Sequence, residues 1–290
     1  MSVTTVAVAA RAEVGEGPVW SSGPGELYWV DIPVGVVRRD SPFSSAGARI
    51  TLPWSVGAVA LRADSGLFFA SAAGFGVIDD HSEPWRYDLR APFARPGYRM
   101  NDGKCDAAGR FWAGGTAIDF RPGGGSIHVV DDEWQVRTAL TGLTLPNGMD
   151  WSPDGTEFYL ADTMQHQVYA FEFDVTSGRL GRRRVVIDFS PERGLPDGLT
   201  VDADGSLWIA MWGQGRVLQV APDGGKMASV EVPVHQPSSC AFGGADYGTL
   251  FITSAREGLA VEDGAVDGSV LAVSDLDVHG RAPYVFGRPR

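Results

Sequence analysis

The feature that most constrains this chain is a short motif that returns six times along it. Each copy has a turn that contains Gly, followed by a run of aromatic and β-branched residues. The intervals between the first residues of successive runs are 40, 44, 47, 49 and 43 residues. The runs begin at Leu27, Leu67, Phe111, Phe158, Leu207 and Leu250. The turns have the chemistry of β-hairpins, and a period of this length indicates a repeat architecture.

A repeat of this size predicts the fold class. A unit of 40 to 49 residues with several short strands is typical of one blade of a β-propeller. Six units therefore predict an all-β, six-bladed β-propeller that forms a single domain over residues 1–290. A β-sandwich or two small barrels would share the short strands but would not explain the constant spacing. We expect residues 1–20 to supply a strand that closes the ring against the last blade.

Charge and composition exclude some classes of binding partner. The formal net charge is −12, which argues against binding to nucleic acid or to an anionic membrane surface. The apolar stretch at residues 6–10 is too short to span a membrane and follows no basic residue. Two cysteines without a CxxC pair fit a reducing compartment, although a disulfide between Cys105 and Cys240 stays open. We expect a soluble, cytoplasmic protein of undetermined oligomeric state.

A second pattern lies ten or eleven residues before the aromatic runs. In four of the six units a Glu, Asn or Asp stands there, followed closely by Gly. These segments are Glu16-Gly17, Asn101-Asp102-Gly103, Asn147-Gly148 and Asp197-Gly198. The other two units carry Ser55-Val56-Gly57 and Ser238-Ser239. The pattern places a polar side chain at an equivalent register in separate blades.

This register predicts a metal site. The first strand of each blade lines the central channel, so we expect Glu16, Asn147 and Asp197 to meet at one end of it. Two carboxylates and an amide oxygen form a hard donor set suited to one divalent cation: Ca²⁺, Mg²⁺ or Mn²⁺, with Zn²⁺ also open. Three protein ligands leave positions for water and substrate, as a catalytic metal requires.

The alternative is that these dipeptides are only turns at blade corners. Asp-Gly and Asn-Gly are common turn formers, and Asp154-Gly155 and Asp204-Gly205 are interpreted in that way here. Any one of the segments alone would favour a turn. The equivalent register of Glu16, Asn147 and Asp197 favours the metal site instead.

Other catalytic arrangements have little support. The sequence has no GxSxG and no HExxH motif, and its five His residues show no paired spacing. His166 follows the fourth aromatic run and is interpreted as a loop residue. The segments Gly74-Phe-Gly76 and Gly213-Gln-Gly215 do not extend to a dinucleotide-binding fingerprint.

Taken together, the motifs resemble the SMP-30/gluconolactonase/luciferin-regenerating family, also called regucalcin-like. The matching stretches run from the first unit to the fifth and so cover most of the chain. They are residues 15–20 (GEGPVW), 99–104 (RMNDGK), 106–112 (DAAGRFW), 145–149 (LPNGM), 152–155 (SPDG), 196–198 (PDG) and 208–213 (WIAMWG).

The resemblance implies a six-bladed propeller with one divalent cation in its channel, and many such proteins hydrolyse sugar lactones. It assigns the metal ligands to Glu16, Asn147 and Asp197 and substrate contacts to Arg99 and Asn101. Asp119 stands where relatives carry a sugar-binding Glu, although a solvated loop residue remains the alternative there.

Two functions follow as hypotheses. The first is hydrolysis of an aldonolactone by a metal-dependent enzyme with Asp197 as the general base. The second is a non-catalytic propeller that binds calcium or another ligand.

Overall fold

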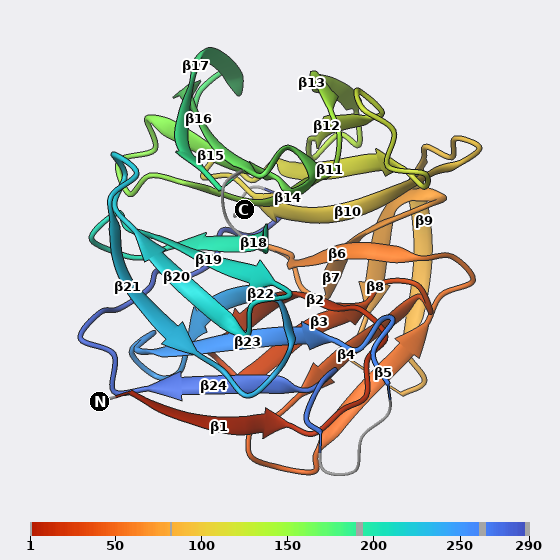
Figure 1. The fold of residues 1–290 in the computed structure, drawn as a ribbon. Helices are drawn as coiled ribbons and strands as arrows, with labels where there is room; N and C mark the ends of the chain where they lie inside the picture. Colours follow the sequence, from red (N-terminus) through yellow and green to blue (C-terminus); the bar gives the residue numbers. More distant parts are fainter. Residues whose placement is uncertain (1, 82, 190–193, 261–264, 288–290) are drawn as a thin grey trace.

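The computed structural model describes residues 2–81, 83–189, 194–260 and 265–287. Within these ranges it contains 24 strands and one short 3-10 helix, η1, at Thr163–Gln165. The strands form six four-stranded sheets arranged as a β-propeller (Figure 1). The predicted all-β, six-bladed fold is therefore confirmed.

Five blades are built from consecutive antiparallel strands. Blade one contains β2 (Gly15–Ser21), β3 (Glu26–Asp31), β4 (Val36–Asp40) and β5 (Gly47–Thr51). Blade two contains β6 (Val56–Leu61), β7 (Leu67–Ser71), β8 (Gly74–Asp79) and β9 (Arg86–Pro92). Blade three contains β10 (Tyr98–Cys105), β11 (Phe111–Ala117), β12 (Gly125–Val130) and β13 (Val136–Leu143). Blade four contains β14 (Pro146–Trp151), β15 (Glu157–Asp162), β16 (Gln167–Asp174) and β17 (Arg179–Asp188). Blade five contains β18 (Leu195–Val201), β19 (Leu207–Trp212), β20 (Arg216–Val220) and β21 (Lys226–Glu231).

The sixth blade joins the two ends of the chain. It consists of β22 (Gln236–Gly243), β23 (Thr249–Ala255), β24 (Val270–Ser274) and the N-terminal strand β1 (Val3–Val8). β1 runs antiparallel to β24, with Val3 opposite Ser274 and Val6 opposite Leu271. The strand predicted within residues 1–20 is thus confirmed, and it covers the edge that β24 would otherwise leave open.

The repeated aromatic runs are the second strands of the blades. They pack between neighbouring sheets, as where Trp112 of blade three lies 5.2 Å from Phe158 and 5.9 Å from Trp151 of blade four, measured between ring centroids. All three rings are almost fully buried. Such offset and edge-to-face contacts add to the burial of large apolar surfaces. The motif that sets the repeat therefore forms the core between the blades.

The first strands line the channel, and each of them is irregular at the same place. All six show a shift in register against the second strand at the polar segment found in the sequence. The shifts lie between Glu16 and Val19, Val56 and Ala58, Met100 and Gly103, Pro146 and Met149, Pro196 and Leu199, and Pro237 and Ser239. A bulge turns a side chain away from the regular alternation of the strand. The polar segments are therefore bulges within strands, and not turns at blade corners.

Glycine at these bulges allows neighbouring blades to approach each other closely. A Cβ atom on Gly148 would lie 2.1 Å from the backbone nitrogen of Leu199, and one on Gly198 would lie 2.1 Å from Oγ of Ser239. Each glycine follows a predicted metal ligand directly. Its role is to bring the first strands together around the channel.

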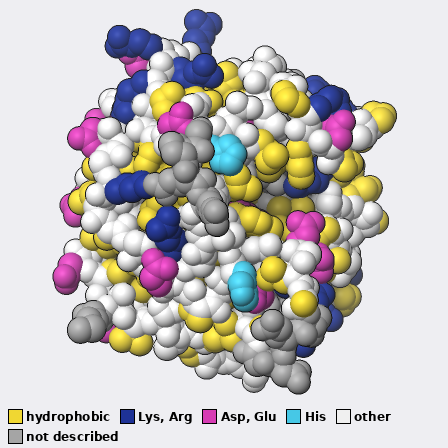
Figure 2. Space-filling model, in the orientation of Figure 1, with side chains coloured by type: hydrophobic (Ala, Val, Ile, Leu, Met, Phe, Trp, Pro, Cys, Tyr) yellow, Lys and Arg dark blue, Asp and Glu magenta, His cyan; other side chains and the backbone are white. Residues whose placement is uncertain are grey.

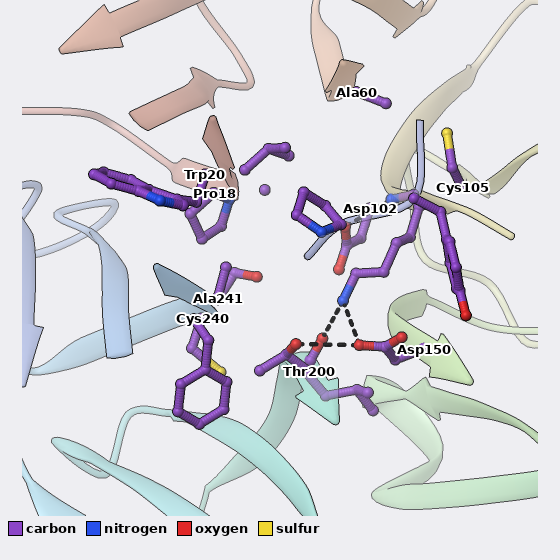
Figure 3. Close-up of a pocket in the computed structure, with 18 of the residues that line it drawn as sticks. Pro18, Trp20, Ala60, Asp102, Cys105, Asp150, Thr200, Cys240 and Ala241 are labelled. Atoms are coloured by element: carbon purple, nitrogen blue, oxygen red, sulfur yellow. Dashed lines mark hydrogen bonds and ion pairs between the residues drawn. The ribbon is translucent and has the colours of Figure 1, made fainter. Parts of the chain in front are cut away.

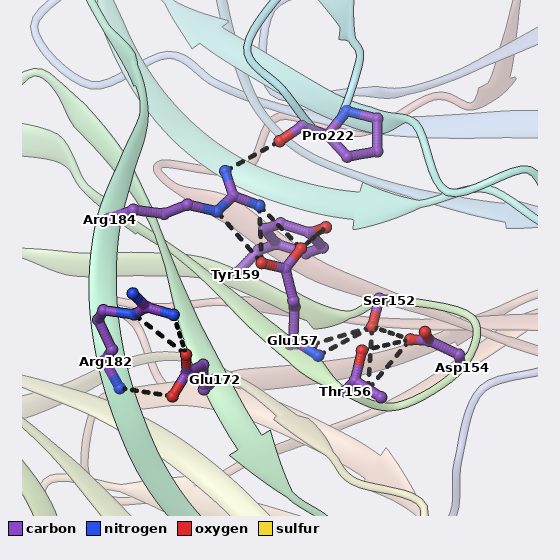
Figure 4. Close-up of polar contacts among 9 residues, drawn as sticks. All are labelled: Ser152, Asp154, Thr156, Glu157, Tyr159, Glu172, Arg182, Arg184 and Pro222. Atoms are coloured by element: carbon purple, nitrogen blue, oxygen red, sulfur yellow. Dashed lines mark hydrogen bonds and ion pairs between the residues drawn. The ribbon is translucent and has the colours of Figure 1, made fainter.

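Blade four shows that similar motifs can be purely structural. Asp154, in the hairpin between β14 and β15, accepts hydrogen bonds from Ser152 Oγ at 2.6 Å and Thr156 N at 3.1 Å (Figure 4). The outer strand of the same blade is β17, and Figure 2 shows basic side chains gathered over it. One of them, Arg184, contacts the carboxylate of Glu157 at 2.7 Å. These carboxylates serve the blade and not the channel.

Candidate metal centre

The predicted site residues converge at one end of the channel, here called the mouth. Glu16, Arg99, Asn101, Asn147 and Asp197 all line one pocket of about 410 Å³. They come from β2, β10, β14 and β18, so four separate blades contribute. Five of the six residues singled out from the sequence are thus brought together. The sixth, Asp119, is considered below.

Asn147 has the geometry expected of a metal ligand. Its Nδ2 donates to Oδ1 of Asp197 and, at 3.1 Å, to Oγ1 of Thr163. Its Oδ1 is buried and has no hydrogen-bond partner. A buried amide oxygen without a donor is costly unless something satisfies it. A hard cation beside Oδ1 would do so.

Two buried carboxylates accompany this oxygen. Glu16 is 3% exposed and Asp197 is 4% exposed. Burial, the charge of Asp197 and that of Asp102 raise the pKa of Glu16 well above its usual range. Burial and the charge of Asp102 likewise raise the pKa of Asp197, against the opposing influence of Arg99. The carboxylates lack enough compensating positive charge, so the donor set fits a divalent cation.

Among the described residues that line the pocket, Arg99 is the one cation; it is half-buried and held in place by its own neighbours. Nη1 of Arg99 donates to Oδ1 of Asn101 at 2.6 Å and to the carbonyl of Met100 at 3.2 Å. Nδ2 of Asn101 in turn donates to the carbonyl of Pro146 at 3.1 Å. Burial lowers the pKa of Arg99, while the charges of Glu16, Glu257 and Asp197 act in the opposite direction. A fixed guanidinium therefore faces the pocket from one side.

The mouth also contains residues that the sequence analysis did not single out. Most of them follow the second strand of a blade, five to nine positions after the start of the aromatic run. Two of them, Thr163 and Glu257, are polar. The others form an apolar wall, which consists of Val14, Ile32, Pro33, Ile118, Phe120, Leu145 and Trp212. Their common position after the repeated run was a signal that could have found several of them.

Comparison with known proteins places the chain in a family. The sequence model of the "SMP-30/Gluconolactonase/LRE-like region" matches residues 14–256, which include all three predicted metal ligands. The chain belongs to this family. Regucalcin from Oryctolagus cuniculus is 33% identical over 281 residues, which is 94% of each chain. The resemblance seen in the motifs is thus confirmed.

Two solved structures of similar proteins share the fold. A luciferin-regenerating enzyme superposes with a TM-score of 0.90 at 25% identity, over 99% of this chain and 100% of the other. A regucalcin from Agrobacterium tumefaciens, described as a calcium-binding protein, superposes with a TM-score of 0.89 at 30% identity, over 97% of each chain. Both likenesses extend over nearly all of the propeller.

Of the six predicted site residues, Asp119 alone is not among those that line the pocket. Its neighbours Ile118 and Phe120 line the mouth, but its carboxylate contacts Nη1 of Arg121 at 2.9 Å. The side chain is 62% exposed. The contact of Asp119 with substrate therefore stays a prediction, one that requires the side chain to turn inward.

The opposite end of the channel, here called the base, contains a smaller cavity of about 70 Å³. Asp102, Asp150 and Thr200 point into it (Figure 3). Asp150 accepts hydrogen bonds from Nζ of Lys104 at 2.9 Å, Oγ1 of Thr200 at 3.1 Å and the backbone N–H of Val201 at 2.9 Å. The charge of Asp150 is therefore paired, in a cavity that is lined mainly by apolar residues.

The pKa of Asp150 shifts in the opposite direction from those at the mouth. Burial by itself would raise the pKa, but the positive charges of Lys104 and Arg281 outweigh burial and lower it. Nη2 of Arg281 lies 3.6 Å from Oδ1 of Asp150. The pKa of Asp102 shows both influences. Burial raises it to about 6, while Lys104 and the N–H of Gly103 act against that rise.

The remaining candidate groups have structural positions. Cys105 and Cys240 are buried free thiols at the base, so the alternative of a disulfide between them is not realised. His166 ends η1 and is not among the residues that line either cavity. In the part of the chain that the structure describes, no helix is long and apolar enough to cross a membrane.

Proposed function

We propose that this protein is a divalent-metal-dependent hydrolase that opens a sugar lactone to the corresponding sugar acid. The observation that carries the proposal is the unpartnered amide oxygen of Asn147 beside two buried carboxylates at the floor of an accessible pocket. The family to which the chain belongs includes gluconolactonases. Burial of two carboxylates and an unpaired amide oxygen destabilises the folded state, and such unfavourable arrangements are common at functional sites.

Glu16, Asn147 and Asp197 are the proposed ligands of one Ca²⁺, Mg²⁺, Mn²⁺ or Zn²⁺ ion. Such a cation, when bound, would supply Lewis-acid stabilisation of the negative charge that develops on the lactone carbonyl oxygen. Its charge would also keep both carboxylates ionised, against the effect of burial on their pKa values.

Asp197 is the proposed general base. Its carboxylate accepts a proton from water while the water oxygen forms a bond to the lactone carbonyl carbon. The bond between that carbon and the ring oxygen then breaks, and the ring oxygen takes up a proton. The products balance as one lactone plus one water giving one hydroxy acid. The hydrogen bond from Nδ2 of Asn147 orients the carboxylate for this role.

Arg99 and Asn101 are the proposed substrate-positioning residues. Because Asn101 and the Met100 carbonyl hold the guanidinium of Arg99, its remaining N–H groups point in fixed directions. A substrate oxygen bound by them is oriented relative to Asp197 before reaction.

A second candidate function is a calcium-binding propeller without catalysis. It is favoured by the Agrobacterium tumefaciens regucalcin, which is described as a calcium-binding protein. Ca²⁺ takes six to eight oxygen ligands, and a dedicated calcium site is expected to draw more of them from the protein than the three side chains proposed here. The open donor set therefore favours the enzyme.

One experiment separates the two candidates. Hydrolysis of a panel of aldonolactones is measured with added cations, after chelation, and in Asp197→Ala. We expect turnover that chelation abolishes and a loss of at least about 100-fold in Asp197→Ala, the scale of a lost general base. Asp204→Ala, an exposed carboxylate in the hairpin of the same blade, is the matched control and should retain activity. Equal rates in Asp197→Ala would contradict the mechanism, and cation binding without turnover of any lactone would favour the binding protein.

A further inference from the structure

The mouth pocket divides into a polar floor and an apolar wall. The floor carries the proposed metal ligands together with Arg99, Asn101 and Thr163, while the wall consists of the seven apolar residues named above. Among the described residues that line the pocket, Glu257 is the only exposed charged side chain. The polar side chains of the floor are mostly buried, whereas Ile118 and Phe120 are exposed, so a bound molecule would meet polar groups at its buried end and these two apolar side chains nearer the rim.

Several polar groups of the floor already have partners. Asn101 uses its amide nitrogen on the Pro146 carbonyl and its oxygen on Arg99. Oγ1 of Thr163 donates to the carbonyl of Pro196 at 2.8 Å and accepts from Asn147. Asp119, the rim carboxylate expected to bind sugar hydroxyls, contacts Arg121 instead. On the described lining of the pocket, few groups remain to satisfy the hydroxyls of a fully hydroxylated substrate, and a buried hydroxyl without a partner is unfavourable.

Phe120 is a second and independent sign of an apolar subsite. Its backbone has a φ of 50°, a conformation that bulky residues rarely adopt. The guanidinium carbon of Arg99 lies 5.7 Å from the centre of its ring, and the N–H of Phe120 donates to the Ala117 carbonyl at 2.9 Å. The strained backbone thus holds an aromatic side chain at the pocket, where it remains 36% exposed.

We propose that the lactone opened at this site is deoxygenated on the carbon farthest from the lactone group, so that a methyl group packs on Phe120 and Ile118. The preferred substrate class is thus a deoxy-sugar lactone and not a fully hydroxylated aldonolactone. This inference rests on the proposed lactonase function, because the lactone group is taken to lie over Asp197.

The test uses two lactones that differ by one hydroxyl. D-Fucono-1,4-lactone is the 6-deoxy form of D-galactono-1,4-lactone. With the cation-loaded protein we expect kcat/KM for the fucono-lactone to exceed that for the galactono-lactone about tenfold, since the side chains of Phe120 and Ile118 offer the extra hydroxyl of the latter no hydrogen-bond partner. A ratio of one or less would overturn the inference.

Phe120→Asn tests the subsite itself. Asn tolerates positive φ, so the variant replaces the apolar ring with a polar group without new backbone strain. We expect the ratio of the two kcat/KM values to fall to about threefold or less. The matched control is Phe43→Asn, which also changes an exposed Phe at positive φ (63°) but lies in the turn between β4 and β5, away from the pocket lining. An unchanged ratio in Phe120→Asn, or an equal fall in Phe43→Asn, contradicts the assignment.

Binding of the corresponding lactams separates this inference from the proposed reaction. Lactams resist hydrolysis, so calorimetry with the cation-loaded protein reports the preference of the pocket alone. We expect the 6-deoxy lactam to bind about tenfold more tightly than its hydroxylated counterpart. The same preference without turnover of any lactone would refute the hydrolase and leave the apolar subsite standing. Equal binding, or binding of neither lactam, would overturn the subsite.

Discussion

The mouth and the base of the channel are built from the same strands but treat buried charge in opposite ways. β10 places Asn101 at the mouth and Lys104 at the base, and β14 places Asn147 at the mouth and Asp150 at the base. At the base, a lysine, an arginine, a hydroxyl and two backbone N–H groups surround the carboxylate of Asp150. At the mouth, two buried carboxylates and an unpaired amide oxygen have one half-buried arginine nearby among the described residues of the pocket.

The difference shows what distinguishes a structural acid from a candidate ligand in this fold. Burial alone raises the pKa of a carboxyl group in both places. Donors and cations reverse that shift for Asp150 but not for Glu16 or Asp197. A carboxylate saturated by the protein stabilises the channel, whereas an unsaturated one leaves room for a cation.

The strongest test of this comparison is to remove the acid at the base. Asp150→Ala leaves Lys104 without its carboxylate partner, and we expect a loss of about 3 kcal/mol in the free energy of unfolding at pH 7. Urea denaturation measures it. Asp64→Ala, which removes a carboxylate that is 60% exposed, should change stability by less than about 0.5 kcal/mol. Equal stability of the two variants would show that the network at the base is not structural.

Glu16 at the mouth should make folding stability depend on pH in the opposite sense from Asp150 at the base, because the pKa of Glu16 is raised and that of Asp150 is lowered. In the metal-free protein the pKa of Glu16 is raised above its ordinary value of 4.5, so the folded state holds its proton longer than the unfolded state does. Stability therefore falls as the pH rises from that value through the folded pKa. Because a cation competes with protons for the carboxylates, we expect thermal stabilisation by Ca²⁺ or Mn²⁺ to be larger at pH 8 than at pH 5.5. Equal stabilisation at both pH values would contradict the proposed ligand set.

Glu16→Gln sharpens the same test. The substitution removes one of the two repelling buried charges and nearly preserves the shape of the side chain. We expect the metal-free protein to gain about 1 kcal/mol at pH 8, as often happens when a functional site is relaxed. The variant should also lose most of the stabilisation by cations. A destabilised variant that still responds fully to cations would assign Glu16 a structural role like that of Asp150.

The smallest expected effect concerns Asp119. Its exposed ion pair with Arg121 contributes less than about 1 kcal/mol, so the side chain is free to turn toward a substrate. If it does, Asp119→Glu changes the relative rates for five- and six-carbon lactones by about two- to threefold and leaves cation affinity unchanged. Equal effects on all lactones would leave Asp119 as a solvated loop residue.

Much of this molecule was predictable from the sequence because it depends on repetition. The aromatic runs indicated the number of blades, since each run forms the same packing layer between sheets. The polar segments before the runs indicated which residues meet at the channel, because equivalent positions in a ring converge on one axis. On that basis Glu16, Asn147 and Asp197 were expected to meet, and they line one pocket together with Arg99 and Asn101, whose roles came from the family resemblance.

Only the tertiary structure showed which partners each buried side chain has, because these do not follow from the sequence repeat. The sequence does not distinguish Asp150 from Asp197 as buried acids, and only the positions of Lys104 and Arg281 make the first a structural residue. Nor does it show that Asp119 turns outward while its neighbours Ile118 and Phe120 form a wall. The channel register is local to each blade and repeats in the sequence, whereas the partners of a side chain come from other blades and depend on packing in three dimensions.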